Sequence, residues 1–434
     1  MIQESKVIRF LAAVARFFQI SFQNSRSCFN VMNFSGFLQA AFLKSLTCAA
    51  LLRLPALYPR RLFDALDAVN ARIEKSKVEL FHPAISFPLV YLSFVAISSY
   101  TVSNLALFSI LLGIAFFILG VRLSARLRFR EIFLENYIER IAAILLAVGV
   151  LSLAYDLFYA GAIPLLEPAA RRKLSVIFTM LASLTVPGGI LAISVIGKHL
   201  RQGRIGIGEA RIYAILVTLV VTFLISLLGF RTQTIVALLG CSISMYYLRI
   251  LGITEILASF FAALFSISFL GYYRALTQGA MVGFFEVIGK RIGLTLGVYD
   301  YLIDRFWVFG ANHGTVFLAT FSSLFPFIPG PRLGPRTMVA SIFEVREVSI
   351  TSTLLGTVVL DFGIPGVIAF ALVLGFVVGA AYHAMKQTKS YLATMIFSFL
   401  LAYVLVGIET GLVDFNVAMF FIVSFLILLA SARP

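Results

Sequence analysis

Long apolar segments, separated by short basic loops, constrain this chain more than any other feature of its sequence. A helix needs about 20 mostly apolar residues to cross the hydrocarbon core of a membrane, and such segments recur between residues 84 and 430. Hydrophobic residues make up 60% of the 434 residues and charged residues only 13%, whereas about 25% of the residues of soluble domains are charged. The sequence therefore predicts an all-α, polytopic transmembrane helical bundle.

Ten spans are predicted after residue 80, at residues 84–100, 104–121, 138–160, 174–197, 212–230, 234–248, 256–273, 363–385, 391–408 and 413–430. Basic loops after residues 121 and 197 lie on the same side of the bundle, and the positive-inside rule places that side in the cytoplasm. The rule also accounts for most of the net charge of +15 without a nucleic-acid partner. A multi-pass protein of the cell membrane is expected.

Residues 1–80 are predicted to form a separate region, and residues 81–434 the transmembrane domain. Two apolar segments of this region, residues 7–22 and 31–52, are interrupted by charge. Each could cross the membrane or lie on its surface as an amphipathic helix. The highly charged residues 53–79 favour a cytoplasmic, largely helical connector.

The connection at residues 274–352 is predicted to be a large external loop with short interfacial helices. Residues 275–288 and 292–309 have amphipathic patterns, and residues 316–325 are apolar but too short to span. Four prolines and two glycines then force an irregular turn at residues 325–336. This turn either delivers its two arginines into a wet cavity, where irregular backbone is tolerated, or is an ordinary external loop.

Several arginines lie on the outer side, where the positive-inside rule predicts few. Arg231 lies at the outer turn of a tight helical hairpin, and Arg274 ends the next outgoing helix at about the same depth. Either could simply reach lipid headgroups. Charge at this depth is costly unless it is used, however, and further arginines follow in the loop. We expect a site for an anionic substrate group, with the candidates Arg231, Arg274, Arg291, Arg332 and Arg336.

Two other side chains are candidate catalytic groups. His313 could act as a general base, since histidine exchanges protons near neutral pH, or could serve as a structural hydrogen-bonding residue. Asp361 is expected about one residue outside the returning helix, either as an acid favoured by the helix dipole or as a group that orients an arginine or a substrate hydroxyl. No histidines have metal-ligand spacing, so neither a metal nor a cofactor is expected.

Three short motifs carry a resemblance to a known family: GFRTQ at residues 229–233, the proline-rich turn at residues 325–336, and TLLG at residues 353–356 leading to DFGIPG at residues 361–366. Through them, the chain resembles the oligosaccharide repeat unit polymerases, the Wzy-like relatives of O-antigen polymerases and ligases. The resemblance extends from about residue 138 to the C-terminus and leaves the first 80 residues without a counterpart.

The resemblance implies a metal-independent glycosyltransferase whose active face is external or periplasmic. Such an enzyme transfers a growing glycan from a polyprenyl diphosphate carrier to a hydroxyl of another lipid-linked repeat unit. Its partners would be this lipid-linked glycan, membrane lipids, and a chain-length regulator or a flippase. On this hypothesis Arg231 and Arg274 bind the diphosphate, an arginine of the proline-rich turn closes over it, and His313 or Asp361 activates or orients the acceptor hydroxyl.

Two alternatives remain open at the level of sequence. A ligase of the same superfamily would use nearly the same site with a different acceptor. A lipid-linked glycan flippase or transporter would carry its charges along a central path near the membrane midplane, without a large external loop. The position of the arginines in and beside the loop favours the enzyme over the transporter.

Overall fold

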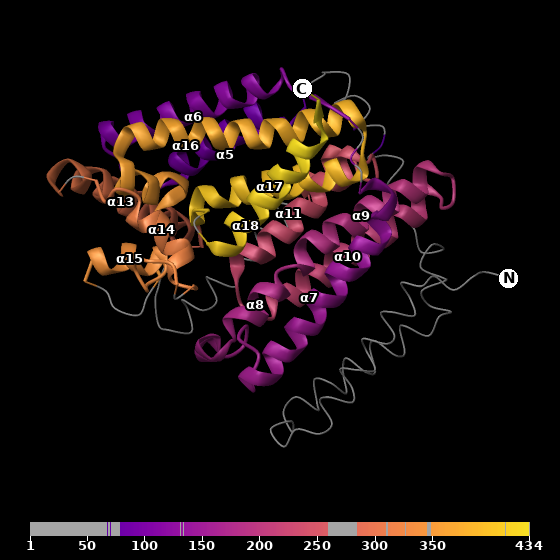
Figure 1. Cartoon of the computed structure of the whole chain (residues 1–434), viewed down its shortest axis with the longest axis horizontal. Coiled ribbons are helices and arrows are strands. Elements are labelled where there is room, and N and C mark those ends of the chain that lie inside the picture. Colours follow the sequence, from indigo (N-terminus) through magenta and orange to yellow (C-terminus); the bar gives the residue numbers. More distant parts are fainter. Residues whose placement is uncertain are drawn as a thin grey trace.

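The computed structural model describes Asp67, Asn70 and residues 79–130, 132, 134–258, 284–309, 311–325, 327–344, 349–412 and 414–433. Within these residues the structure is almost entirely helical, as predicted (Figure 1). The elements in chain order are α5 (Pro83–Ile97), α6 (Asn104–Ser124), β1 (Arg128–Phe129), η2 (Glu135–Tyr137), α7 (Ile138–Ala160), η3 (Pro168–Lys173), α8 (Val176–Ala182), α9 (Thr185–Arg201), α10 (Ile207–Ser226), α11 (Arg231–Tyr247), α13 (Phe284–Phe309), α14 (Thr315–Ser322), α15 (Pro335–Ile342), α16 (Thr353–Thr388), α17 (Tyr391–Thr410), α18 (Phe415–Ser431) and β2 (Ala432–Arg433).

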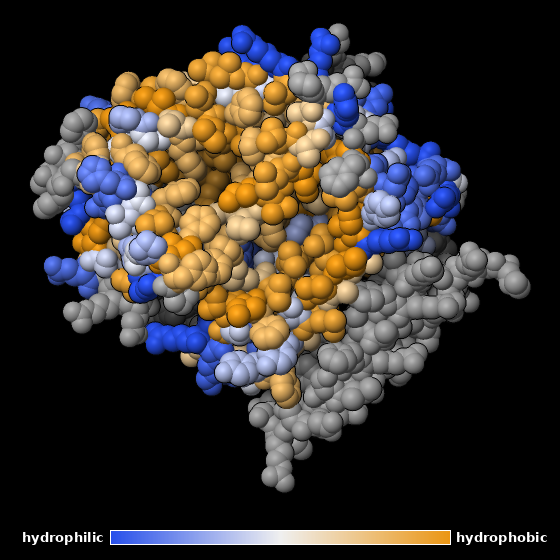
Figure 2. All heavy atoms as spheres, in the orientation of Figure 1, coloured by the Kyte–Doolittle hydropathy of each residue, from blue (hydrophilic) through white to orange (hydrophobic). Residues whose placement is uncertain are grey.

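The helices of the described residues include six segments that are long and apolar enough to cross a membrane: α6, α7 with the preceding turn, α8 together with α9, α10, α16 and α17. Two further apolar helices, α5 and α18, are shorter, and α11 has 17 residues. Nine of the ten predicted spans thus coincide with these helices, while most of the tenth, residues 256–273, lies outside the described residues. Figure 2 shows apolar residues across the middle of one face and hydrophilic residues toward its sides. The chain is a polytopic helical membrane protein.

The centre of the bundle is α17. Every residue from Leu392 to Ile408 is buried, and the helix packs against α9, α11 and α16. A helix that is apolar on all sides can be placed only in the interior of a protein or in lipid. By contrast, α10 and α18 expose large apolar side chains such as Leu219 and Leu426, as expected for helices that face hydrocarbon.

Close packing of α6 on α16 forms one wall of the bundle, where the two helices run side by side (Figure 1). A Cβ atom on Gly375 would lie 2.1 Å from the carbonyl oxygen of Phe117. A Cβ atom on Gly120 would lie 2.2 Å from the carbonyl oxygen of Leu372. Glycine at these positions lets the two backbones touch, which is a common way to join helices in lipid.

The predicted break between residues 288 and 292 is wrong, because α13 runs through it as one helix of 26 residues. An ion pair between Lys290 and Glu286, one helical turn apart at 2.7 Å, supports the helix at this point. Conversely, the single span predicted at residues 174–197 is divided into α8 and α9. Pro187 explains this division, since it has no N–H to donate to the carbonyl group of Ser183.

The start of α16 was also predicted wrongly. The helix begins at Thr353 and not at Gly363, so Asp361 lies inside a helix and not before one. Gly363 has φ 63° and ψ −155° and kinks the helix, and Pro365 follows within it. The seven residues from Leu354 to Leu360 are all buried, and this burial explains why the chain stays helical ahead of the kink.

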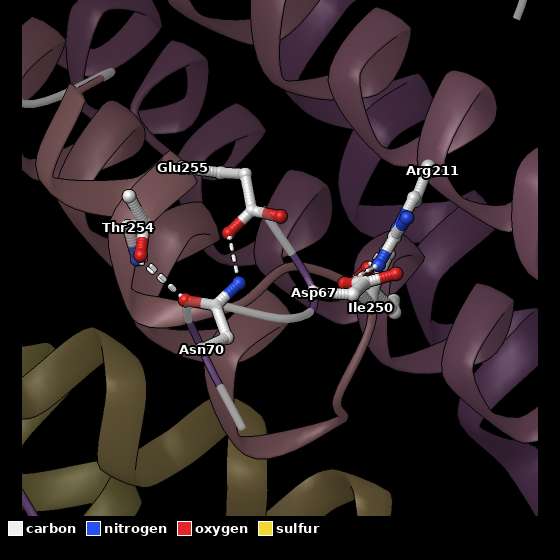
Figure 3. A network of polar contacts seen from close by, with 6 residues as sticks. All are labelled: Asp67, Asn70, Arg211, Ile250, Thr254 and Glu255. Atoms are coloured by element: carbon white, nitrogen blue, oxygen red, sulfur yellow. Dashed lines mark hydrogen bonds and ion pairs between the residues drawn. The ribbon is translucent and has the colours of Figure 1, made fainter. Parts of the chain in front are cut away.

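The two ends of the bundle differ in the contacts that join their loops. One end, called here the basic end, carries Arg122 to Arg130 after α6 and the α9–α10 connection with Arg201 and Arg204. Asp67 and Asn70 lie beside it (Figure 3). Arg211 Nη2 pairs with Asp67 at 2.6 Å. Asn70 accepts from Thr254 N at 3.0 Å and donates to Glu255 at 2.7 Å. The opposite end, called the site end, holds the α5–α6, α10–α11 and α17–α18 turns.

Glu79 ties the start of α5 to the basic end of α16. Its carboxylate accepts hydrogen bonds from Tyr382 Oη and Lys386 Nζ, both at 2.6 Å. Burial raises the pKa of this carboxyl group, but the two hydrogen bonds and the charge of Lys386 outweigh burial and hold the pKa of Glu79 below its ordinary value.

We expect Gly375→Ala to lower the melting temperature of the detergent-solubilised protein, because the added methyl group has to push α6 away. Overpacking of this kind costs roughly 1–3 kcal/mol. Gly297→Ala is the matched control in another helix, since the nearest atom to its Cβ, in Tyr100, lies at 3.6 Å. Equal melting temperatures for the two variants would contradict the close packing of α6 on α16.

Ionised Glu79 is expected to stabilise the fold only above acidic pH. Since its folded-state pKa lies below the ordinary value of 4.5, the contribution is complete above that value and is lost as pH falls through the folded-state pKa. The melting temperature of Glu79→Gln should therefore lie below that of the wild type at about pH 7, and the gap should narrow toward pH 3. A difference in melting temperature that stays constant over this pH range would show that ionisation of Glu79 does not stabilise the fold.

Candidate functional site

The first turn of α18 joins three parts of the site end. Asp414, the residue before the helix, forms an ion pair with Arg336 of α15. The ring of Phe415 contacts the rings of Phe321 and Phe325 at centroid distances of 5.9 and 5.4 Å. The amide of Asn416 lies 3.5 Å from the Ser183 hydroxyl between α8 and α9. Three successive residues thus connect α15, α14 and the α8–α9 junction.

A second junction forms where α14 meets the kink of α16. The backbone N–H of Asn312 donates to the carbonyl of Leu360 at 3.1 Å, and that of His313 donates to the carbonyl of Asp361 at 3.0 Å. In a regular helix these carbonyls would accept from Ile364 and from position 365, where proline has no N–H. The loop before α14 therefore fills a gap that the kink opens.

The side chain of Asp361 is fully buried and caps α14. Its two carboxylate oxygens accept from the backbone N–H groups of Val316 at 3.0 Å and Phe317 at 2.7 Å. These groups belong to the first turn of α14, whose N–H groups have no partner within their own helix. Asp361 therefore interacts with the N-terminus of α14, whereas the sequence placed it just before the returning helix.

His313 is exposed beside this cap and has an unusual backbone. Its φ is 49°, and that of Gly314 is 85°, so two successive residues adopt the left-handed conformation. A non-glycine residue in this region costs about 1–3 kcal/mol and persists where its surroundings fix it. Here the hydrogen bond to the Asp361 carbonyl and the cap of α14 fix it. The imidazole is thus presented to solvent from a rigid backbone.

Two arginines lie at the α10–α11 turn. Gly229 has φ 73° and turns the chain sharply, and its carbonyl accepts a hydrogen bond from Arg171 Nη2. The same guanidinium lies over the ring of Phe230 at 5.9 Å. Arg231, the next residue, is exposed and is the first residue of α11. A cation at a helix N-terminus opposes the helix dipole, so helix stability does not explain its position.

Sequence reasoning overlooked Arg171. The signal that could have found it is the run Arg171-Arg172-Lys173, which lies in a connection between two spans on the predicted outer side. Basic runs are depleted there. In the structure this run is the end of η3, and it reaches the GFRTQ segment, whose Gln233 has a buried side-chain oxygen with no hydrogen-bond donor among the described residues.

The remaining predicted arginines already have partners, and Arg274 lies outside the described residues. Arg291 of α13 pairs with Glu409 at the end of α17 at 2.6 Å, and Arg336 pairs with Asp414. Arg332 donates to the carbonyl of Ser322 at 2.8 Å and so closes the proline-rich turn onto the end of α14. Arg291 and Arg336 thus fasten the predicted external loop to the bundle, and Arg332 joins two parts of the loop itself.

Figure 2 shows a hollow in the apolar face, with hydrophilic residues at its bottom, at the place that the labels α11 and α18 occupy in Figure 1. Within the described ranges, no three His, Cys, Asp or Glu side chains lie together as a metal site. The site end of the bundle therefore carries guanidinium groups, an exposed imidazole on a fixed backbone, and the first turns of α11, α14 and α18.

In the comparison with known proteins, a family model and a relative each match most of the chain. A family model described as "Putative O-antigen polymerase" matches residues 79–421. An uncharacterized protein of Methanocaldococcus jannaschii, MJ0419, is 30% identical over 352 residues, which cover 80% of this chain and 92% of that protein. No solved structure matches.

Removal of the Asp361 cap should loosen the segment that carries His313. We expect Asp361→Ala to cost about 1–2 kcal/mol and to speed hydrogen exchange at residues 312–317, with a smaller effect for Asp361→Asn, which keeps one acceptor oxygen. Exchange measured by mass spectrometry on the purified protein checks this. If Asp361→Asn abolished activity without changing exchange at Val316 and Phe317, the carboxylate would act on the substrate directly.

Proposed function

The chain belongs to the O-antigen polymerase family, and from this premise we propose that it is a membrane glycosyltransferase that polymerises polyprenyl-diphosphate-linked oligosaccharide repeat units. The observation that carries the proposal is the pair Arg171 and Arg231 at the α10–α11 turn. A diphosphate is a dianionic group that planar guanidinium forks bind with two hydrogen bonds each. The N–H groups at the start of α11 add to the same attraction.

The proposed reaction needs stabilisation of a leaving group and removal of one proton. The acceptor hydroxyl oxygen forms a bond to the anomeric carbon of the donor glycan, and the bond from that carbon to the diphosphate oxygen breaks. The diphosphate leaves with the electron pair, and Arg231 and Arg171 stabilise its growing negative charge. The hydroxyl proton passes to the imidazole of His313.

Four further predicted residues, and also Gln233, have roles in this proposal that follow from their surroundings. Asp361 positions His313 through the cap of α14 and does not itself receive the proton. Arg332 shapes the proline-rich turn, and Arg291 and Arg336 hold α13 and α15 against the α17–α18 turn. Gln233 offers its buried oxygen to a hydroxyl group of the substrate.

We propose that the reaction takes place on the external face of the membrane. The site end lies opposite the arginine-rich loops after α6 and α9, which the positive-inside rule assigns to the cytoplasm. The resemblance to repeat unit polymerases implies lipid-linked repeat units as the donor on this face, where no nucleotide sugar is needed. A chain-length regulator or a flippase that delivers the units is a proposed partner.

Substitution of Arg231 by Ala should abolish polymer and leave single repeat units on the carrier lipid. Removal of one group that stabilises developing charge costs roughly 10²–10³ in rate, and Arg171→Ala should have an effect of the same order. Lys173→Ala is the matched control, since Lys173 is exposed at the end of the same short helix. The measurement is the profile of lipid-linked glycans in cells that carry each variant at equal membrane level.

The same profile separates the alternatives. Complete polymer retained on the carrier in cells that lack the protein would identify a ligase, and single units trapped on the cytoplasmic leaflet would identify a flippase. Normal polymer from Arg231→Ala would overturn the assignment of the site.

A further inference from the structure

A cavity of about 580 Å³ opens at the basic end, where α6 passes into β1. It is lined by Ala125, Arg126, Leu127, Arg128, Phe129 and Gln387. Its volume falls in the range of small-ligand sites, about 300–1,000 Å³. Since α6 runs from the site end to this end, the cavity is a different place from the proposed glycosyl-transfer site and has no part in that reaction.

The wall of the cavity is held by hydrogen bonds. The side-chain amide of Gln387, near the end of α16, donates to the carbonyl of Leu127 at 2.9 Å and accepts from the N–H of Phe129 at 3.0 Å. The strand β1 also pairs with β2, which follows α18 directly. Figure 1 shows the C-terminal end of the chain beside the ends of α6 and α16. Two separate parts of the chain, the end of α16 and β2, thus fix the backbone that carries Arg126 and Arg128.

The arginines here lack the partners that other basic residues have. Arg126 and Arg128 are exposed, and within the described residues neither side chain forms a hydrogen bond or an ion pair. Elsewhere at this end Lys198 pairs with Glu139 at 2.9 Å, and Lys386 pairs with Glu79 at 2.6 Å. The positive-inside rule explains why arginines lie at this end, but it does not require a cavity with two unpaired ones in its wall.

Apolar side chains beside the cavity are exposed. Leu123 in the last turn of α6 and Leu429 in the last turn of α18 have 37% and 57% of their surface accessible. Side chains of this kind at a helix end contact acyl chains. Basic pockets between transmembrane helices on the cytoplasmic side are a known form of lipid headgroup site.

We propose that this cavity binds a phosphate group through Arg126 and Arg128. The group is either the headgroup phosphate of an anionic phospholipid in the adjoining leaflet or free phosphate. Arginine suits both because its planar fork meets two phosphate oxygens at once.

Thermal melting of the full-length protein in nanodiscs tests the proposal. The lipid is phosphatidylcholine alone, phosphatidylcholine with phosphatidylglycerol, or phosphatidylcholine with added inorganic phosphate. We expect phosphatidylglycerol to raise the melting temperature of the wild type, and the double variant R126Q/R128Q to bind it roughly thirtyfold more weakly, from a factor of about five for each arginine near the surface. R204Q, which removes an exposed arginine at the same end, should respond as the wild type does.

Each outcome decides the proposal. Stabilisation by phosphatidylglycerol that is lost in R126Q/R128Q supports it with a lipid as the ligand. The same result with inorganic phosphate supports it with free phosphate as the ligand. No stabilisation by either, or equal stabilisation of the double variant and the wild type, overturns it. Melting in phosphatidylcholine alone is the control for misfolding. In this lipid the double variant should be as stable as the wild type or more stable.

Discussion

The hydrogen bonds that fill the kink of α16 determine the arrangement of the site end. A membrane helix that bends at Gly363 and Pro365 leaves carbonyl groups without donors, and such groups cost several kcal/mol in hydrocarbon unless the protein supplies partners. The N–H groups of Asn312 and His313 are those partners. The chain before α14 is therefore held against α16 by the same constraint that makes the kink tolerable, and His313 takes its left-handed backbone as a result.

Attachment of the other loop helices is of a different kind. Two ion pairs, from Arg291 to Glu409 and from Arg336 to Asp414, join α13 and α15 to the α17–α18 turn. The Arg291 side chain is 49% exposed, and ion pairs exposed to that degree contribute about 0–1 kcal/mol. The buried Asp361 cap is stronger, since it satisfies two N–H groups with a carboxylate. The position of α14 is thus fixed more firmly than that of α15.

Arginine has different uses at the two ends of the bundle. At the site end, Arg291, Arg332 and Arg336 are used in building the loop. At the α10–α11 turn, Arg171 donates to the carbonyl of Gly229, and the exposed Arg231 begins α11. At the basic end, Arg126 and Arg128 have no partner among the described residues and line a cavity. Charge alone does not separate the loop arginines from Arg126 and Arg128, but the presence of a nearby acceptor does.

Apolar segments and the loops between them determined the fold class, the order of the spans and the end at which the arginines gather, because segment length and charge bias act locally. The partners of those arginines could not be predicted. Arg171 meets Gly229 across 58 residues of sequence, and Asp361 caps a helix that begins 46 residues before it, at Thr315. Such pairs are decided by how helices pack, since only the tertiary structure brings an orphaned N–H or carbonyl to a distant side chain.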